Sequence, residues 1–389
     1  MVVLGNPFNT GQVARPSELI DRSAENETFG TFLDSTMRKS PMDLAVCGIR
    51  GIGKTSLLAK FEETALRKNC IVLRMEAEEG KYSGILDIYS ELLSLLNAEL
   101  TRRSVMKRLS GKVGSFLDSF SFTLTYQEIG IKVEGKKAKD ELAPVVFREK
   151  MAQIWENIKT EVPAVVIIID EAEFLEGMAG GLMALRNAFS RLGEKECGYM
   201  VVLSGRMTFH KEMNELFSPL TRFFHPLELK PLSEKDVGKL FLLHLKKTST
   251  RIDEECIENI SQDSEGHPYV LLVMGHVLFN NLPQGERTIT LEHYHKNTKA
   301  IMDYLAIELF NGMYEKLSNV ERTIIYGLAR LGGTARVSEL VKKTKKGYGD
   351  VSPYLKSLLR KGSIIKIGRG EYKIFHSLYT RYVLAIYES

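Results

Sequence analysis

Short apolar runs alternate with longer segments of helical periodicity over the first 230 residues of the chain. A run of about four to eight apolar residues is typical of a buried strand, and apolar residues three or four positions apart are typical of an amphipathic helix. The runs predict strands at 43–48, 71–75, 164–169, 198–203 and 224–229. The periodic segments predict helices at 21–37, 55–66, 83–100 and 143–160, and Asp21 is expected to cap the first of them. This alternation predicts an α/β fold.

A glycine-rich stretch connects the first predicted strand to the helix that follows it. Its sequence is Gly48-Ile49-Arg50-Gly51-Ile52-Gly53-Lys54-Thr55-Ser56. The spacing is that of a phosphate-binding loop of the Walker A type, in which backbone N–H groups surround a phosphate. Lys54 is then expected to reach the β- and γ-phosphates of ATP, and Thr55 to hold Mg²⁺. The strand before and the helix after supply the structural context that this motif requires.

A second chemical motif ends the third predicted strand, where Asp170 and Glu171 follow an unbroken apolar run. Acids at the carboxyl end of a parallel strand lie at the crevice where α/β sheets bind ligands. Asp170 is expected to hold Mg²⁺, and Glu171 to act as the general base that activates water. Ser204, after the fourth strand, fits a contact with the γ-phosphate or the water, although serine is also common in turns. Glu173 is expected to be a solvated neighbour.

Two features of the core have more than one interpretation. Alternating β-prone residues within 120–136 predict a hairpin insert, which either touches DNA, contacts a neighbouring subunit or packs on its own domain. Arg222 precedes the fifth predicted strand, where it either reaches the ATP site of a neighbouring subunit or lies on the surface. Both features leave a homo-oligomer or a protein partner open.

Taken in order, these motifs resemble the AAA+ and STAND-type P-loop ATPases, and among them the archaeal and bacterial group related to the origin-recognition initiator ATPases. The matching stretches are 16–22, 48–56, 167–171, 204–206, 218–222, 231–233 and 265–269. The resemblance implies a five-stranded parallel sheet of the ASCE type and a helical lid. It also implies that Arg22 lies beside the adenine and that His267 and Pro268 line the nucleotide site. No sensor arginine is evident in 265–275, which favours the STAND-like branch, where ATP acts as a slow conformational switch.

The end of the chain has a different order of elements. Helical periodicity covers 317–331, 337–344 and 351–361, and two β-prone runs follow at 364–367 and 372–375. Three helices and a hairpin are the order of a winged helix, whose third helix is the recognition helix. The chain is therefore expected to contain an ATPase core at 1–230, a helical lid at 231–310 and a winged-helix domain at 311–389.

Charge supports a nucleic-acid interface in this last part. Between Thr334 and Arg381, twelve Lys and Arg residues stand against three acids, which gives +9 there and −5 elsewhere for a net +4. Such a basic region is typical of contact with the phosphates of double-stranded DNA. The candidate contacts are Tyr348, Ser352, Tyr354, Lys356, Arg360 and Arg369. The alternative is a winged helix that packs as an arm and holds the ATPase closed.

Composition narrows the class of protein. Hydrophobic residues make up 44% of the chain and charged residues 26%, which is typical of a soluble globular protein. The sequence contains no apolar run of the roughly 20 residues that span a bilayer, and no signal peptide. Its four cysteines are scattered without metal-ligand spacing, which indicates reduced thiols. We therefore expect a cytoplasmic protein without a membrane partner.

Two main hypotheses follow. The first is an ATPase that binds ATP or ADP with Mg²⁺ and acts on DNA in replication, transposition or genome maintenance. The second is a signalling or defence switch whose winged helix makes protein contacts and inhibits the ATPase. A third is a scaffold that nucleotide stabilises without turnover.

Overall fold

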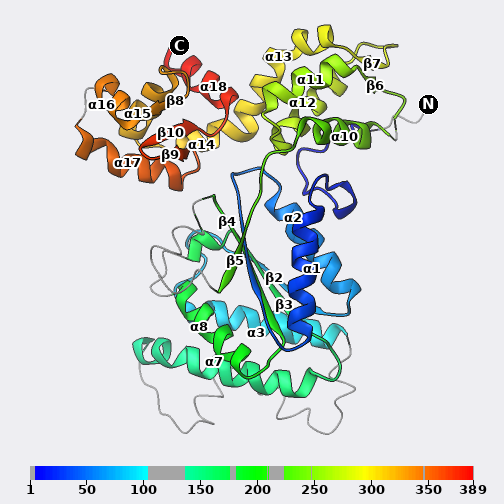
Figure 1. Ribbon diagram of the computed structural model, residues 1–389, viewed down its shortest axis with the longest axis vertical. Coiled ribbons are helices and arrows are strands. Elements are labelled where there is room, and N and C mark those ends of the chain that lie inside the picture. Colours follow the sequence, from blue (N-terminus) through cyan, green and yellow to red (C-terminus); the bar gives the residue numbers. More distant parts are fainter. Residues whose placement is uncertain are drawn as a thin grey trace.

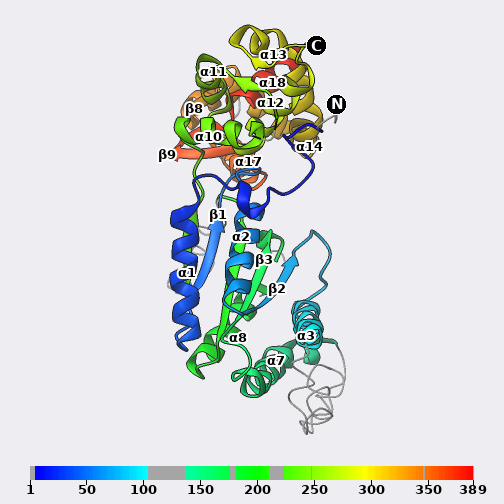
Figure 2. The ribbon, with the colours of Figure 1, turned by 90° about the vertical axis from the view of Figure 1, so that its right-hand side faces the viewer.

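The computed structural model describes residues 5–103, 136–175, 181–207, 209, 223–246, 248–344 and 347–388. The protein is elongated, with a sheet-bearing core at one end and a layer of helices across the other (Figures 1 and 2). Arg222 and the predicted hairpin lie outside the described residues, apart from Lys136, which begins a helix.

The core contains one five-stranded sheet in the order β2-β3-β4-β1-β5, and all its strand pairs are parallel. The strands are β1 (Asp43–Cys47), β2 (Ile71–Glu76), β3 (Val165–Asp170), β4 (Tyr199–Gly205) and β5 (Phe224–Glu228). Strands β1, β3 and β4 are buried along their whole length. Their apolar runs are continuous because both faces of the sheet are covered. The predicted parallel α/β sheet is confirmed.

Helices cover both faces of this sheet (Figure 2). On one face lie α1 (Ser23–Met37) and α2 (Lys54–Arg67), and on the other α3 (Ile85–Arg102), α7 (Lys136–Ile158) and α8 (Gly181–Glu194). Phe29 of α1 stacks on Phe61 of α2 at 4.3 Å between ring centroids, a contact of about 0.5–1.5 kcal/mol beyond the burial of area. The predicted cap of α1 is wrong. Asp21 has a left-handed backbone with φ 54°, and Arg22 occupies the N-cap position without a side-chain cap.

The second half of the chain begins with four helices, which we call the helical segment. They are α10 (Glu234–Leu245), α11 (Glu254–Ser264), α12 (Pro268–Asn280) and α13 (Leu291–Leu305). The short strands β6 (Arg251–Ile252) and β7 (Thr288–Ile289) pair beside them. The start of the chain, before the 3-10 turn η1 (Pro16–Glu18), packs on this segment. Phe8 is fully buried there, 5.2 Å from the ring of Phe241.

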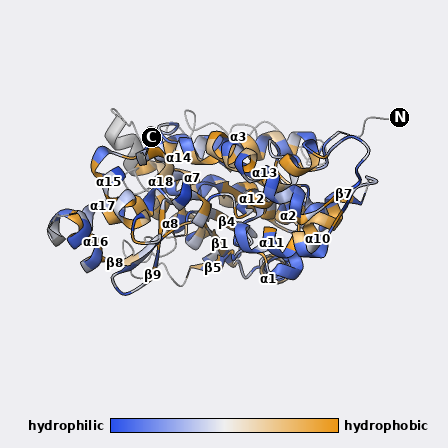
Figure 3. Ribbon diagram, turned by 90° about the horizontal axis from the view of Figure 1, so that it is seen from above, coloured by the Kyte–Doolittle hydropathy of each residue, from blue (hydrophilic) through white to orange (hydrophobic). Residues whose placement is uncertain are grey.

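A π-helical turn, η4 (Ala306–Phe310), and α14 (Asn311–Glu315) lead to the remaining elements, which we call the C-terminal module. The module contains α15 (Asn319–Ala329), β8 (Thr334–Arg336), α16 (Val337–Thr344), α17 (Tyr348–Arg360), β9 (Ile364–Gly368), β10 (Glu371–Ile374) and α18 (Ser377–Glu388). The three helices predicted within 317–361 and the two strands predicted within 364–375 are present, and β8 adds an antiparallel third strand beside β10. Figure 3 shows hydrophobic and hydrophilic residues interspersed along the helices of this layer.

Candidate nucleotide site

The glycine-rich loop joins β1 to the N-terminus of α2. Gly51 and Gly53 have φ of 77° and 99°, values that favour glycine because a Cβ makes them strained. At Gly48, a Cβ would lie 2.7 Å from Cγ2 of the buried Ile52, so only glycine permits this close turn. Lys54 begins α2, and Thr55 and Ser56 follow in its first turn. The loop thus places the positive end of a helix dipole at the edge of the sheet.

The side chain of Lys54 folds back over the loop. Its Nζ donates hydrogen bonds to the carbonyl oxygens of Gly48 at 3.1 Å and Ile49 at 3.2 Å. Burial lowers the pKa of Lys54, and the negative charges of Glu173, Asp170 and Glu171 oppose that shift. A cation that is desolvated and bonded to carbonyl oxygens is well placed to exchange these partners for phosphate oxygens.

Asp170, Glu171 and Ser204 meet at the carboxyl ends of β3 and β4. The hydroxyl of Ser204 donates to Oδ1 of the buried Asp170. The backbone N–H of Glu171 donates to the same oxygen at 3.1 Å and to Oγ of Ser204 at 3.3 Å. Glu171 has a left-handed backbone with φ 52°, which turns the chain sharply at the strand end. Burial, and after it the charge of Asp170, raises the pKa of Glu171.

These residues fit a nucleotide with a magnesium ion. The tight turn of the loop depends on glycine at Gly48 and Gly51, where a Cβ would lie 2.7 Å from Ile52 and from His267, respectively. Carboxylate and hydroxyl oxygens, such as those of Asp170 and Thr55, are the ligands that Mg²⁺ prefers. Within the described ranges, no cluster of three or more His, Cys, Asp or Glu side chains has the geometry of a further metal site. The roles assigned to the individual residues stay predictions.

The sequence interpretation missed Glu173. This residue lies on the 3-10 turn η2 (Ala172–Leu175), directly after the strand end. Its Oε2 is inaccessible to solvent and has no hydrogen-bond partner among the described residues. Burial raises the pKa of Glu173, whereas the charges of Lys54 and Arg206 oppose the rise. The expectation that Glu173 is a solvated neighbour was therefore wrong. Nothing in the local sequence indicates that this turn places the carboxylate towards the interior.

The helical segment touches the loop through His267. This residue is buried, and its Nε2 donates to the carbonyl oxygen of Arg50 at 2.8 Å. Its Nδ1 accepts from the backbone N–H of Val270 at 3.4 Å, so the ring caps α12, which begins at Pro268. Burial lowers the pKa of His267 to about 3. A Cβ on Gly51 would lie 2.7 Å from Cε1 of this ring, so the loop and the helical segment are in direct contact.

Arg22 has protein partners in the structure. It is buried, and its guanidinium donates to the carbonyl oxygens of Lys230 at 2.8 Å and Asp21 at 3.0 Å. It also pairs with Glu25 at 3.7 Å. The side chain therefore ties the start of α1 to the segment that leaves β5, and its place beside an adenine stays a prediction.

Part of the basic charge of the C-terminal module is used inside the protein. Lys361 pairs with Glu321 and Lys373 with Glu265, both at 2.7 Å. Arg381 lies 3.5 Å from Asp263. Of the candidate DNA contacts, Lys356, Arg360 and Arg369 are exposed, whereas Ser352 and Tyr354 are half-buried and Tyr348 belongs to α17.

Comparison with known proteins agrees with this description. Residues 38–213 match the AAA domain family, and the fold of the chain is that of P-loop ATPases such as the origin-recognition proteins. A Walker-type ATPase of Pyrococcus abyssi has a TM-score of 0.62 at 19% identity, over 97% of this chain and 99% of that one. The ORC2 protein of Aeropyrum pernix, in its ADPNP–ADP complexes, has a TM-score of 0.61 at 15% identity, over 99% of this chain and 96% of that one.

One relative in sequence is a protein of Methanocaldococcus jannaschii described as an uncharacterized HTH-type transcriptional regulator. It is 22% identical over 94% of this chain and 88% of its own length. In the described part of the chain, helices that combine the length and the hydropathy of a membrane span are absent.

Proposed function

We propose that the protein is an ATP-hydrolysing molecular switch that binds duplex DNA through its C-terminal module. The observation that carries the ATPase half is the position of three groups on three adjacent strands. The loop with Lys54 follows β1, Ser204 lies at the end of β4, and Asp170 ends β3. Because parallel strands place their carboxyl ends at one edge, a nucleotide held by the loop reaches the carboxylates of β3.

The chemistry follows from these residues. Lys54 and the N-terminus of α2 bind the phosphates of ATP. Thr55 and Asp170 would hold Mg²⁺, which when bound neutralises charge on the transferred phosphate. Glu171 takes a proton from the attacking water, and its raised pKa makes it a stronger proton acceptor. Ser204 keeps Asp170 and the backbone of Glu171 in one arrangement through its hydrogen bonds.

The nucleotide lies, in this proposal, between the core and a lid formed by the helical segment. His267 and Pro268 line that boundary, and the direct contact of His267 with the loop supports the assignment. The same proposal includes a second subunit, which Arg222 and the hairpin within 120–136 would contact. The division into an ATPase core at 1–230, a helical lid at 231–310 and a winged-helix domain at 311–389 is part of this proposal.

The DNA half rests on the exposed basic residues of the C-terminal module. Lys356 and Arg360 extend from α17, and Arg369 lies in the turn between β9 and β10. In a winged helix these are the recognition helix and the wing tip, so the three cations face one DNA duplex. The relative from M. jannaschii carries the description of a helix-turn-helix regulator, which supports the same reading.

The alternative is a signalling or defence switch in which the module is an inhibitory arm. The ion pairs of Lys373 and Arg381 with the helical segment favour it, because they consume basic charge in an internal contact.

Fluorescence anisotropy with a labelled random duplex distinguishes the two functions. Binding is measured with ATP and with ADP at two salt concentrations. The test variant replaces Lys356, Arg360 and Arg369 by Ala. The matched control removes three exposed positive charges elsewhere, at Arg67, Lys195 and Lys299. A DNA-binding module predicts that the test variant, and not the control, loses affinity and reduces the slope of log K against log salt by about 3. Absence of binding in both nucleotide states overturns the DNA half and favours the inhibitory arm.

A further inference from the structure

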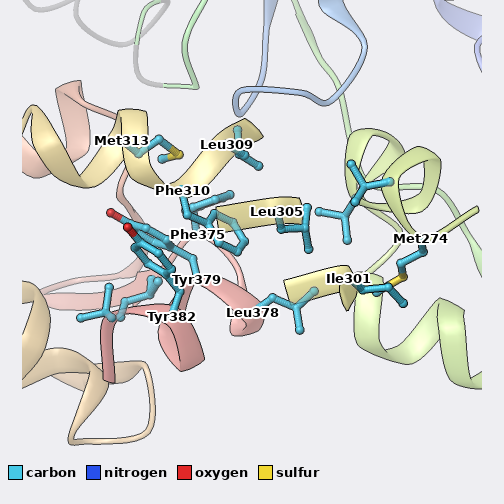
Figure 4. Close-up of a cluster of buried hydrophobic side chains, with 14 of the residues drawn as sticks. Met274, Ile301, Leu305, Leu309, Phe310, Met313, Phe375, Leu378, Tyr379 and Tyr382 are labelled. Carbon is cyan, nitrogen blue, oxygen red and sulfur yellow. The ribbon is translucent and has the colours of Figure 1, made fainter. Parts of the chain in front are cut away.

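The helical segment and the C-terminal module share one apolar core. A single cluster of buried side chains begins at Phe8, continues through α10–α13 and ends in α18. Figure 4 shows part of it, from Met274 and Ile301 to the aromatic side chains of Phe310, Phe375 and Tyr379. The ring centroids of Phe310 and Tyr379 are 5.2 Å apart. Separation of the two parts would expose this surface to water, at roughly 25 cal/mol for each Å².

The sheet-bearing core has two other apolar clusters, one on each face of its sheet. Ile49 in the glycine-rich loop packs partly against both the cluster beside α1 and α2 and the cluster of the helical segment. The boundary between apolar clusters therefore lies between the sheet-bearing core and the helical segment, and the C-terminal module lies on the same side of it as that segment.

Polar contacts reinforce the shared core at the corner between α11 and α12. Oε2 of Glu265 accepts from Nζ of Lys373, and its Oε1 accepts from the backbone N–H of Ser377, both at 2.7 Å. Ser377 is the first residue of α18, where a carboxylate also interacts favourably with the helix dipole. Burial disfavours the charge of Glu265, but these two partners outweigh burial and lower its pKa to about 2.

His376 makes a second contact between the same two parts. Its Nε2 lies 2.8 Å from the carbonyl oxygen of Ser264 and its Nδ1 accepts from the backbone N–H of Leu378. A ring that donates through Nε2 and accepts through Nδ1 is neutral. Its centroid lies 5.8 Å from that of His267, with the rings nearly perpendicular. The ring that touches the loop is therefore packed against the C-terminal module.

The contacts with the core are of a different kind. They include the hydrogen bond between His267 and the carbonyl of Arg50, and the backbone connection that leaves β5. Along this connection, the N–H of Leu232 donates to the carbonyl of Gly266 at 2.8 Å. A Cβ on Gly266, which has φ 68°, would lie 2.1 Å from the carbonyl oxygen of Leu232. The connecting chain therefore lies directly against the corner that carries Glu265 and His267.

We propose that the helical segment and the C-terminal module move relative to the sheet-bearing core as one rigid body, which we call the arm, and that the contacts of Glu265 hold its two parts together. In this proposal, the contact of His267 with the Arg50 carbonyl transmits changes in the glycine-rich loop to the arm. The proposal rests on nucleotide binding at the loop. Phosphates draw Lys54 away from the carbonyls of Gly48 and Ile49, and the loop backbone that holds His267 changes with it. The arm rotates as a unit because rotation on the core leaves the shared apolar cluster and the Glu265 contacts intact.

Distances between spin labels test this arm. The four native cysteines are buried, so exposed cysteines are labelled selectively at Glu27→Cys on α1, Lys299→Cys on α13 and Ser338→Cys on α16. The three pairs are measured by double electron–electron resonance without nucleotide, with ATP and with ADP. The arm predicts that both distances from position 27 change with nucleotide, whereas the distance between positions 299 and 338 does not.

A nucleotide-dependent change between positions 299 and 338 overturns the rigid arm. If all three distances stay constant while a fluorescent ATP analogue binds, the sensing contact is overturned. If the analogue does not bind, the proposed ATPase function fails, and the arm is judged without nucleotide by the Lys373→Met variant. Its matched control is Lys361→Met, since Lys361 pairs at the same 2.7 Å with Glu321 inside the module.

The proposal predicts a broader distribution between positions 299 and 338 in Lys373→Met and an unchanged one in Lys361→Met. Equal distributions in both variants overturn the role of the Glu265 contact.

Discussion

His267 makes a prediction about pH that can be worked out from the structure. The change is His267→Asn, which removes the imidazole and keeps a residue that caps a helix well, so α12 retains its N-terminal hydrogen bond to Val270. In the native protein the ring is buried, donates to Arg50 and accepts from Val270. Protonation would place a second N–H against the N–H of Val270. This geometry agrees with a pKa of about 3, which burial lowers from 6.5, with a further lowering by the positive charge of Lys54.

The magnitude follows from the difference between the folded and unfolded pKa values. As the pH falls below 6.5, the unfolded chain binds a proton at this residue and the folded chain does not, until the pH approaches 3. The contribution of His267 to stability is therefore fully present above pH 6.5 and is lost as the pH falls. At pH 5.0 the loss amounts to about 2 kcal/mol, at 1.36 kcal/mol for each pH unit. The Asn variant has no such loss.

The assay is urea unfolding at pH 7.5 and pH 5.0 without nucleotide, with two probes. The chain has a single tryptophan, Trp155, which is buried in the core. Its fluorescence follows the core, and far-UV circular dichroism follows all helices. The circular dichroism transition of the wild type should lose about 2 kcal/mol more than that of His267→Asn between the two pH values. The fluorescence transition serves as the internal control, since the core should respond equally in both proteins.

Equal pH dependence of the circular dichroism transition in the two proteins would refute the reasoning. It would mean that His267 is free to bind a proton in the folded state. A buried ring bonded to Arg50 and Val270 does not permit this.

Three further predictions concern the core. Glu171→Gln should lower ATP turnover by about 10²–10⁴-fold, the usual contribution of a general base, and retain binding of a fluorescent ATP analogue; unchanged turnover removes Glu171 from that role. Glu173→Gln should tighten ATP binding in the same binding assay, because it removes a negative charge that acts on Lys54; weaker or unaltered binding contradicts this. Gly198→Ala should destabilise the core by about 1–3 kcal/mol, since its Cβ would lie 2.5 Å from the ring of Trp155; an unchanged urea midpoint by tryptophan fluorescence would show that the ring moves aside freely.

The sheet and the glycine-rich loop could be predicted from sequence because their signals are local. A strand buried on both faces must be apolar throughout, and this is visible for β3 in the run that ends at Asp170. The loop requires glycine where φ is positive, as at Gly51 and Gly53. Each signal needs only neighbouring residues, so the five parallel strands and the glycine-rich loop between β1 and α2 lie where the sequence predicted them.

Other features depend on residues far apart in the chain, and the sequence carried no sign of them. The Oε2 atom of Glu173 is inaccessible to solvent because η2 packs beside β4, and an acid two residues after Glu171 gives no indication of this. Arg22 bonds to a carbonyl 208 residues away. The charge count of the C-terminal module was correct as a sum, but Lys373 and Arg381 face acids of the helical segment and contribute less to an external surface than their number indicates.

If the rigid arm and the DNA interface both hold, the loop and α17 are linked through one body, and their coupling must be reciprocal. The factor by which ATP changes the affinity for DNA must equal the factor by which DNA changes the affinity for ATP, because both measure one coupling free energy. Anisotropy of labelled DNA with and without ATP gives the first factor, and titration of a fluorescent ATP analogue with and without DNA gives the second. His267→Asn removes the ring that joins the arm to the Arg50 carbonyl, so it should bring both factors towards one while each ligand still binds. A variant that keeps the full coupling would place the link outside the corner between α11 and α12.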